Sequence, residues 1–298
     1  MHGWLVIDKP VGIGSTQVVG AVKRALRDGG YAKVKVGHGG TLDPLASGVL
    51  PVALGEATKL AGRMLDSDKA YEFTICFGVE TDTLDAEGKV TALSDKFIEG
   101  ADVEDVLVDF IGPLQQQPPA YSALKVDGKR AYDLARSGVE VTLATRAIVV
   151  RDLNYIAWWQ EGAGRQFATL TARVSKGTYI RSLARDIAHA LDTVGHVTML
   201  RRTRAGPFTL DAAISLDKLS EAAKGRTLEQ HLLPLTAGLD DIPALPVDPD
   251  QAGALRQGRK LIGIAVQPGL YLATDQDVPV ALVELDEDGL RVLRGFNL

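Results

Sequence analysis

Residues 37–48 of the chain read GHGGTLDPLASG, a stretch that interrupts the regular spacing of apolar residues on both sides. Four glycines and a proline within twelve residues are typical of a loop whose backbone comes close to another group. Asp43 precedes Pro44, which biases its backbone towards extended conformations. A carboxylate on such a loop is a candidate nucleophile or general base. A turn aspartate that accepts backbone hydrogen bonds explains the same local composition, so both interpretations stay open.

The segments around this loop mix strand-like and helical patterns without a regular βαβα alternation. Strand-like runs occur at residues 4–7, 71–78, 122–126, 148–156 and 167–174, and helical spacing occurs at 15–28, 56–65, 103–111 and 178–191. Ser15 is expected to cap the first helix, and residues 112–119 are expected to form an irregular loop. The pattern predicts the α+β class, with a mixed, largely antiparallel sheet core and flanking helices.

Two domains are expected from the length of 298 residues. Residues 238–249 (GLDDIPALPVDP) are rich in Pro and Asp and are interpreted as a linker. The last fifty or so residues carry short β-like runs at 269–274, 278–284 and 290–294. We therefore predict a catalytic domain over residues 1–238, followed by a linker and a small β-rich domain over residues 239–298.

The composition limits the protein class. Apolar residues make up 46% and charged residues 24% of the chain, which excludes a disordered protein. The net formal charge of −5 argues against a globally basic nucleic-acid binder, so any site for a polyanion has to be local. The single cysteine, Cys76, suits a reducing compartment. No signal peptide or membrane-length apolar run is recognised, and a cytoplasmic protein is expected.

Metal and nucleotide motifs do not fit the sequence. The spacings of His38 with Asp43 and of His189 with His196 match no metal-binding pattern. The acids at 82, 85 and 87 lack the register of a calcium-binding loop. Residues 12–14 (GIG) have no third glycine at the position that a dinucleotide-binding loop requires. We expect neither a metal nor a cofactor.

Basic residues gather between positions 173 and 204, where seven of them face only two acids. Concentrated arginine with an interleaved tyrosine, Tyr179, is the pattern expected for phosphate contacts and base stacking. A solvated helix face with an Arg-rich surface strand accounts for the charge equally well, and Tyr71 and Tyr179 equally suit a core. The predicted contacts with RNA phosphates are Lys176, Arg185, Arg201 and Arg202.

Four ordered segments resemble one family, the tRNA pseudouridine-55 synthases (TruB family). HGGTLDPLASGVLPV (38–52) is similar to the family's active-site segment, and GWLVIDKPVGIGS (3–15) to its Lys-Pro motif. KAYEFTICFGVETDTLDAEG (69–88) resembles its tyrosine segment, and VSKGTYIRSLARDIAHAL (174–191) its arginine segment. The matching region runs from about Trp4 to Arg204, and the final residues are similar to an RNA-binding PUA domain.

The resemblance implies a role for individual residues. Asp43 would be the catalytic aspartate, and Arg181 would pair with it. Tyr71 would stack on the target uracil, and His38 would contact RNA near the flipped nucleotide. Tyr179 and Leu200 would line the substrate pocket, and Lys9 is assigned a structural role.

The expected activity is the isomerisation of a uridine to pseudouridine at position 55, in the T arm of tRNA, after the base leaves its stack. The expected partner is tRNA, and the expected state is a monomer without an obligate protein partner. Three alternatives stay open: a non-catalytic RNA-binding or tRNA-folding module, an N-glycosidase that releases uracil, and a guide-RNA-dependent synthase of the dyskerin type. The sequence does not choose whether Asp43 attacks the sugar, attacks the ring or removes a ribose proton.

Overall fold

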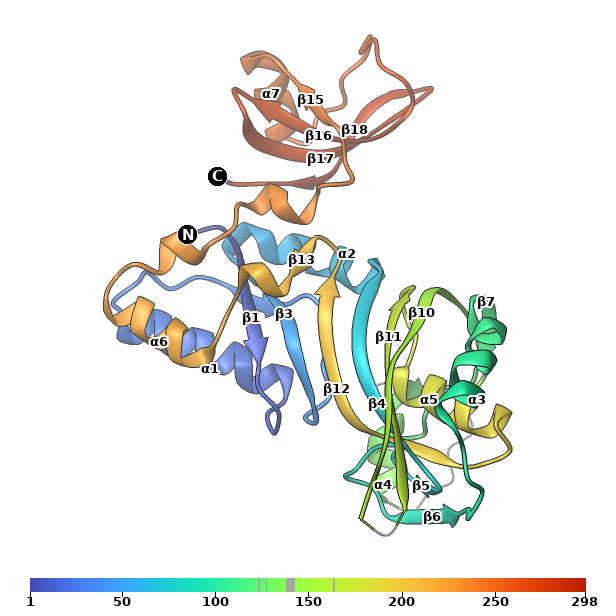
Figure 1. Cartoon of the computed structure of the whole chain (residues 1–298). Coiled ribbons are helices and arrows are strands. Elements are labelled where there is room, and N and C mark those ends of the chain that lie inside the picture. The colour runs from blue at the N-terminus through green and yellow to red at the C-terminus, as the bar shows by residue number, and fades with distance from the viewer. Residues whose placement is uncertain (123, 127, 138–142, 163) are drawn as a thin grey trace.

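The computed structural model describes residues 1–298 except residues 123, 127, 138–142 and 163. The large sheet contains β1 (Gly3–Lys9), β2 (Val36–His38), β3 (Ala46–Leu54), β4 (Lys69–Phe77), β7 (Gly112–Gln116), β10 (Arg146–Glu161), β11 (Arg165–Val174), β12 (Gly195–Ala205), β13 (Phe208–Thr209) and β14 (Ala213–Ile214). Its order is β14-β1-β3-β12-β4-β11-β10-β7, with β2 on β3 and β13 on β12 (Figure 1). The β1–β14 and β3–β12 pairs are parallel and the others are antiparallel. The predicted α+β class is confirmed.

Helices cover the two halves of this sheet with separate cores. Around β1 and β3 lie α1 (Ser15–Asp28) and α6 (Leu216–Lys224), and Val18, Val22 and Leu26 of α1 are buried there at helical spacing. Around β4, β10 and β11 lie α5 (Ile180–Ala190) and α3 (Gly100–Val106), which continues into a 3₁₀ turn, η2 (Leu107–Phe110). In the described residues every helix falls short of the length and apolarity that a bilayer-spanning helix requires.

Shorter elements lie outside the large sheet. Between β3 and β4 lie the 3₁₀ turn η1 (Gly55–Leu60) and helix α2 (Ala61–Asp66). The remaining elements are β5 (Val79–Thr81), β6 (Val90–Leu93), β8 (Lys125–Val126), β9 (Lys129–Arg130), α4 (Ala131–Arg136) and the 3₁₀ turns η3 (Leu210–Ala212), η4 (Leu228–His231) and η5 (Leu235–Gly238).

Three local predictions are wrong. Residues 112–116 are not an irregular loop but strand β7, because they pair with residues 146–150 of β10. In the segment predicted as a strand over 122–126, strand β8 is limited to its last two residues. Helix α1 begins at Ser15 with Gly14 as the N-cap. The Ser15 hydroxyl accepts a hydrogen bond from the Leu42 backbone N–H (2.8 Å) and so fastens the loop before β3 to the start of α1.

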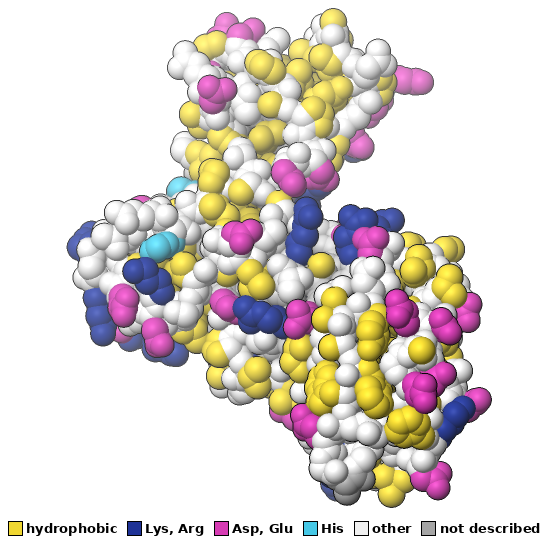
Figure 2. Space-filling model, in the orientation of Figure 1, with side chains coloured by type: hydrophobic (Ala, Val, Ile, Leu, Met, Phe, Trp, Pro, Cys, Tyr) yellow, Lys and Arg dark blue, Asp and Glu magenta, His cyan; other side chains and the backbone are white. Residues whose placement is uncertain are grey.

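The C-terminal sheet stands as a lobe on a narrower neck (Figures 1 and 2). Its strands are β15 (Ala244–Pro246), β16 (Gly269–Asp275), β17 (Val278–Asp286) and β18 (Gly289–Gly295), with helix α7 (Pro249–Arg256) against them. Because β15 pairs with β16, residues 244–246 of the segment predicted as a linker belong to this sheet. Lys59 donates a hydrogen bond to the Gly295 carbonyl (2.8 Å), and Phe296 packs in one cluster with Trp4. The domain division at residue 238 and the PUA assignment stay predictions.

The short parallel contact between β3 and β12 places the residues that matter for function. Leu200 lies beside Ala46, and Arg202 lies beside Gly48, so the loop before β3 opens onto β12. On its other side β12 pairs with β4, where Arg202 lies opposite Tyr71. Gly48 has a φ of +100°, and a Cβ there would lie 2.2 Å from the Arg202 carbonyl oxygen. This close approach of two strands therefore requires glycine.

Candidate active site

The loop that carries Asp43 is held in place by a buried lysine. Lys9 is fully buried at the end of β1, and its ammonium group donates hydrogen bonds to the carbonyls of Pro10 (2.9 Å), Ile13 (2.6 Å) and Pro44 (3.2 Å). Burial lowers the pKa of Lys9 to about 8, against an opposing effect of Asp43. The ammonium group joins the loop after β1 to the loop before β3, which supports the structural role assigned to Lys9.

Arg202 supports the same loop from β12. Its side chain is 1% exposed and donates hydrogen bonds to the carbonyls of Val49 (2.8 Å), Thr41 (3.2 Å) and Gly40 (3.2 Å). The predicted phosphate contact at Arg202 stays a prediction, although its buried guanidinium already donates to three carbonyls. Arg202 fixes the two residues that come just before Leu42 and Asp43.

Asp43 and Arg181 form an ion pair of 2.8 Å between their Oδ2 and guanidinium atoms. The Arg181 side chain is 7% exposed, whereas that of Asp43 is 41% exposed. Arg181 also donates to the carbonyls of Thr83 (2.7 Å) and Tyr121 (3.0 Å), so its orientation is fixed from several sides. The charge-assisted contact stabilises the carboxylate in one position while leaving it open to a ligand.

Asp85 is a second partner of Arg181, at 3.4 Å. On the sequence alone it was considered only as a ligand of a calcium-binding loop, which its register excludes. It is buried, and its carboxylate accepts hydrogen bonds from the Thr83 hydroxyl (2.6 Å) and the Glu87 N–H (3.1 Å). A buried guanidinium between two carboxylates is better compensated than one with a single partner. In the sequence, Asp85 stands in TDTLDAEG, which is part of a segment that resembles the family. That resemblance did not assign a function to Asp85.

A pocket of about 310 Å³ opens beside this pair. Four of the predicted substrate or catalytic residues lie in its wall with Asp43: Tyr71, Tyr179, Arg181 and Leu200. Burial raises the pKa of Tyr179, so its hydroxyl remains neutral and able to donate a hydrogen bond. The elements that supply these residues are β4, the start of α5, β12 and the loop before β3.

Ser122 is a further member of the pocket wall that the sequence interpretation missed. Its hydroxyl lies near Tyr179 and acts to lower the pKa of that phenol, but burial has the larger, opposite effect. The Ser122 hydroxyl is buried and makes no well-aligned hydrogen bond to a described residue, although it lies close enough to the Tyr179 phenol to lower that group's pKa. A buried polar atom without a well-aligned partner is uncommon and marks a place where a ligand group can bind.

His38 lies in β2, outside the group of residues that line the pocket. Its Nδ1 accepts a hydrogen bond from the Gly40 N–H (3.4 Å), so the ring is attached to the loop that leads to Asp43. Burial and, to a smaller extent, the Arg202 charge lower the pKa of His38. The ring is therefore neutral at physiological pH. Its predicted contact with RNA stays a prediction.

The other three predicted phosphate contacts of the segment 173–204 are paired with acids. Lys176 contacts Asp66 (2.9 Å), Arg185 contacts Asp186 (2.7 Å) and Arg201 contacts Asp8 (2.8 Å). Of these three, the Lys176 side chain is the most exposed, and those of Arg185 and Arg201 are mostly covered. Their predicted phosphate contacts stay predictions, but the excess positive charge that suggested them is compensated by the fold.

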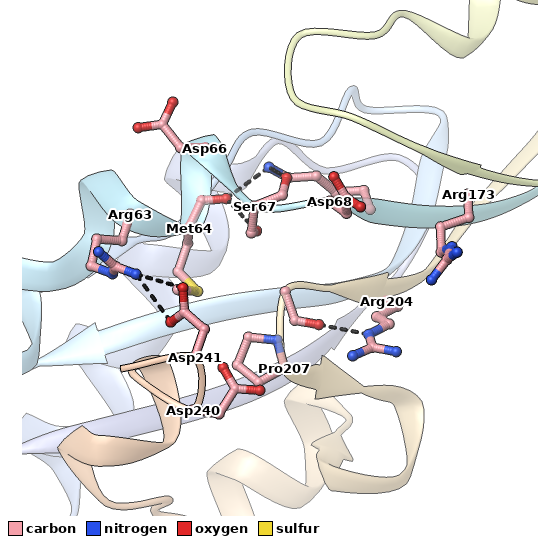
Figure 3. A pocket seen from close by; sticks show the side chains of 12 residues that line it. Arg63, Met64, Asp66, Ser67, Asp68, Arg173, Arg204, Pro207, Asp240 and Asp241 are labelled. Carbon is pink, nitrogen blue, oxygen red and sulfur yellow. Dashed lines mark hydrogen bonds and ion pairs between the residues drawn. The ribbon is translucent and has the colours of Figure 1, made fainter. Parts of the chain in front are cut away.

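Figure 3 shows a second hollow, of about 430 Å³. Lys69 lines both this hollow and the pocket. Arg63 and Asp241 form a bidentate pair across it, at 2.9 and 3.0 Å, and Arg204 donates to the Gly206 carbonyl (2.7 Å). No predicted site residue lines this hollow. Within the described ranges, no three His, Cys, Asp or Glu side chains gather as metal ligands would.

Residues 27–180 match the model of the family described as TruB family pseudouridylate synthase (N terminal domain). The chain belongs to the TruB family. Residues 181–240 of this TruB-family chain match the tRNA pseudouridylate synthase B C-terminal domain.

Curated relatives extend the similarity over the entire TruB-family chain. A tRNA pseudouridine synthase B of Novosphingobium aromaticivorans is 60% identical over 298 residues, covering 100% of this chain and 98% of the relative. One of Zymomonas mobilis is 60% identical over 297 residues, covering 100% and 96%. Among solved structures, an H/ACA ribonucleoprotein bound to a substrate RNA containing 2′-deoxyuridine has a chain with 25% identity and a TM-score of 0.73, covering 99% of this chain and 85% of that one. Membership of this family identifies the chain as a tRNA pseudouridine synthase, which is an isomerase.

Proposed function

We propose that this chain converts uridine 55 in the T arm of tRNA to pseudouridine, with Asp43 as the catalytic carboxylate. The observation that carries the proposal is the 2.8 Å pair of Asp43 with the buried Arg181, in the wall of a pocket. The family and the names of the curated relatives support tRNA as the substrate. The resemblance to the pseudouridine-55 synthases supports the position of the target.

The isomerisation breaks the bond between N1 and C1′, turns the uracil and forms a bond between C5 and C1′. A proton leaves C5 and N1 gains one, so the reaction needs neither an oxidant nor a group donor. The Asp43 carboxylate is half exposed to the pocket, where it attacks the sugar, attacks the ring or removes a ribose proton. Arg181 keeps the carboxylate in place during each of these routes.

The target base has to leave its stack before the carboxylate reaches it, which costs a few kcal/mol. Tyr71 and Leu200 line the pocket from adjacent strands and supply an aromatic and an aliphatic surface. Stacking on one aromatic ring is worth about 1–3 kcal/mol and offsets much of this cost. The detached uracil has to stay beside the ribose, which a shaped pocket with few open sides favours.

The test is to incubate the purified chain with an unmodified T-arm stem–loop and to map pseudouridine at each position. Conversion at position 55 with an unchanged RNA mass is expected. A loss of mass equal to uracil minus one water, as hydrolysis to an abasic site requires, would indicate an N-glycosidase instead. Asp43→Asn is expected to retain RNA binding and lose conversion, because the amide removes the negative charge and keeps the shape. Full activity of Asp43→Asn would refute the role of Asp43.

A guide-RNA-dependent synthase is the second candidate, because the structural likeness includes a chain of an H/ACA ribonucleoprotein. The same incubation separates the two candidates when it contains only the chain and the stem–loop. Conversion without any guide RNA supports the stand-alone enzyme, which we favour from the 60% identity to synthases of the B type. Conversion only after a guide RNA and partner proteins are added would favour the second candidate.

A further inference from the structure

A hollow of about 900 Å³ lies beside the C-terminal half of α1, outside the site described above. Four exposed cationic side chains line it: Lys23, Arg27, Lys33 and Lys35. Its remaining wall is apolar or aromatic and consists of Leu26, Tyr31, Ala32, Val34 and Val36. We call this set of residues the α1 groove. It has a cationic rim over an apolar floor and contains no acidic residue in its lining.

The charges of the α1 groove are not compensated. Arg27 contacts its neighbour Asp28 (3.0 Å), and both side chains are more than half exposed. In the described part of the chain, Lys23, Lys33 and Lys35 take part in no ion pair. Exposed pairs such as Arg27–Asp28 contribute little energy in water. Figure 2 shows Lys and Arg side chains along the outer edge of the lobe that α1 and α6 form. In a chain of net charge −5, such a surface attracts anions.

The α1 groove is joined directly to the loop that carries Asp43. Lys35 is followed by β2, whose residues pair with the last part of β3. After β2 the chain enters the loop that carries Asp43, which is held by hydrogen bonds from Lys9, Ser15 and Arg202. At about 3.3 Å per residue, Lys35 lies only about 10 Å along the strand from His38. Val36 pairs with Leu54, so the groove lies near the end of β3 that is about 26 Å along the strand from Ala46, the residue where β3 begins after Asp43. At about 3.4 Å per nucleotide along a strand, about eight nucleotides of the RNA span this distance.

We propose that the α1 groove binds backbone phosphates of the substrate RNA, outside the nucleotide that enters the pocket. This inference rests on the proposed function only in taking RNA as the substrate. Lysine and arginine on the rim neutralise phosphates and release their counterions, which makes binding depend on salt. The groove contributes to affinity and orientation, whereas Asp43 and Arg181 carry the chemistry.

The test uses the full-length chain with the substitutions Lys33→Glu and Lys35→Glu together. The affinity for unmodified tRNA is measured between 50 and 200 mM salt by fluorescence anisotropy, and conversion is measured in single turnovers at saturating tRNA. We expect a Kd at least about 10-fold higher at 100 mM salt and a salt-dependence slope smaller by about 2, since each phosphate contact contributes nearly one unit. We expect the rate at saturation to stay within about twofold of that of the unchanged chain, because the rim lies outside the pocket.

A matched control carries Lys96→Glu with Arg165→Glu, which changes the net charge equally in the half of the molecule built on β10, β11 and α5. Lys96 pairs with exposed Asp192, and Arg165 is exposed at the start of β11. We expect this control to raise the Kd less than about threefold. Lys33→Gln with Lys35→Gln, which removes charge without reversing it, is expected to give an intermediate loss.

Equal losses in the groove variant and the control would overturn the proposal, because they would reflect net charge alone. An unchanged Kd and slope in the groove variant would also overturn it, and would leave the groove to another anionic partner. A lower rate at saturating tRNA would show that these lysines act in the reaction itself. If the unchanged chain bound tRNA with this groove dependence but converted no uridine, the proposed function would fail and the groove assignment would stand.

Discussion

The Arg-rich segment 173–204 and the α1 groove both concentrate positive charge, but the fold treats them in opposite ways. In the segment, several cations form ion pairs with acids from distant parts of the chain: Lys176 with Asp66, Arg173 with Asp152 and Arg201 with Asp8. In the groove, three of the four cations take part in no ion pair within the part of the chain that the structure describes. The number of cations along a sequence is therefore a poor guide to the field they produce, because their partners are chosen by the fold.

The sharpest way to test this difference is to remove Arg202, the most buried cation of the segment. Arg202→Met leaves the carbonyls of Gly40, Thr41 and Val49 without their donor in a buried site. We expect the free energy of unfolding, measured by urea denaturation, to fall by about 3–5 kcal/mol. Arg201→Met is the control and should cost less than about 1 kcal/mol, because Arg201 is a partly exposed member of an ion pair. A stable Arg202→Met variant with weakened tRNA binding would support the predicted phosphate contact of Arg202 instead.

The second test separates catalysis from binding inside the segment. Arg181→Lys replaces a guanidinium that contacts Asp43, Asp85 and two carbonyls with a single ammonium group. We expect the single-turnover rate to fall by about 100-fold while the Kd for tRNA changes by less than about threefold. Arg185→Lys, one helical turn away and paired with Asp186, should leave the rate within about twofold. Parallel losses of affinity and rate in Arg181→Lys would argue against a role limited to the carboxylate.

These contacts explain which parts of the structure the sequence predicted well. The cores of α1 and α5 follow from apolar residues such as Val18, Val22, Ile180 and Ile187, whose helical spacing is a local signal. Strand β7 was missed because its residues GPLQQ show no alternation, and pairing with β10 makes it a strand. Tertiary context here overrides local propensity.

The candidate site shows the same division between local and distant signals. Asp43 was found because it stands in an unusual loop, and the family resemblance supplied Arg181, Tyr71 and the other pocket residues. The second carboxylate beside Arg181 was not found, since nothing near Asp85 in the sequence distinguishes it from an acid in an ordinary turn. The acids that pair with the Arg-rich segment were not identified either, because most of them are distant from it in the sequence.

A third test contrasts two buried hydroxyls near the pocket. Ser122 makes no well-aligned hydrogen bond with a described residue and lies beside the Tyr179 phenol, whereas Ser182 donates to the Gln117 carbonyl (2.8 Å). Ser122→Ala is expected to change the melting temperature little and to lower the single-turnover rate about 10-fold, because the hydroxyl forms a well-aligned hydrogen bond only when RNA binds. Ser182→Ala should instead lower the free energy of unfolding by about 1 kcal/mol. A fully active Ser122→Ala variant would mean that this hydroxyl bonds to water alone.

The smallest expected effect comes from removing acids that pair with cations of the Arg-rich segment, which makes the segment resemble the α1 groove. Asp66→Asn with Asp152→Asn removes the partners of Lys176 and Arg173, whose side chains are about half exposed or more. We expect the Kd for tRNA at 50 mM salt to fall by about two- to fivefold, with a steeper salt dependence, because each released cation is free to contact a phosphate.

The control for this variant is Asp105→Asn with Asp109→Asn, at the end of α3 and in η2. It removes the same negative charge but interrupts no ion pair within the described residues. Tighter binding in the first variant alone would show that the segment lies along the RNA and is held weak by its own acids. Equal tightening in both would assign the effect to net charge. An unchanged Kd in both variants would mean that the segment lies away from the RNA phosphates even when its cations have lost their acidic partners. The α1 groove would then be the surface that determines how strongly the affinity for tRNA depends on salt.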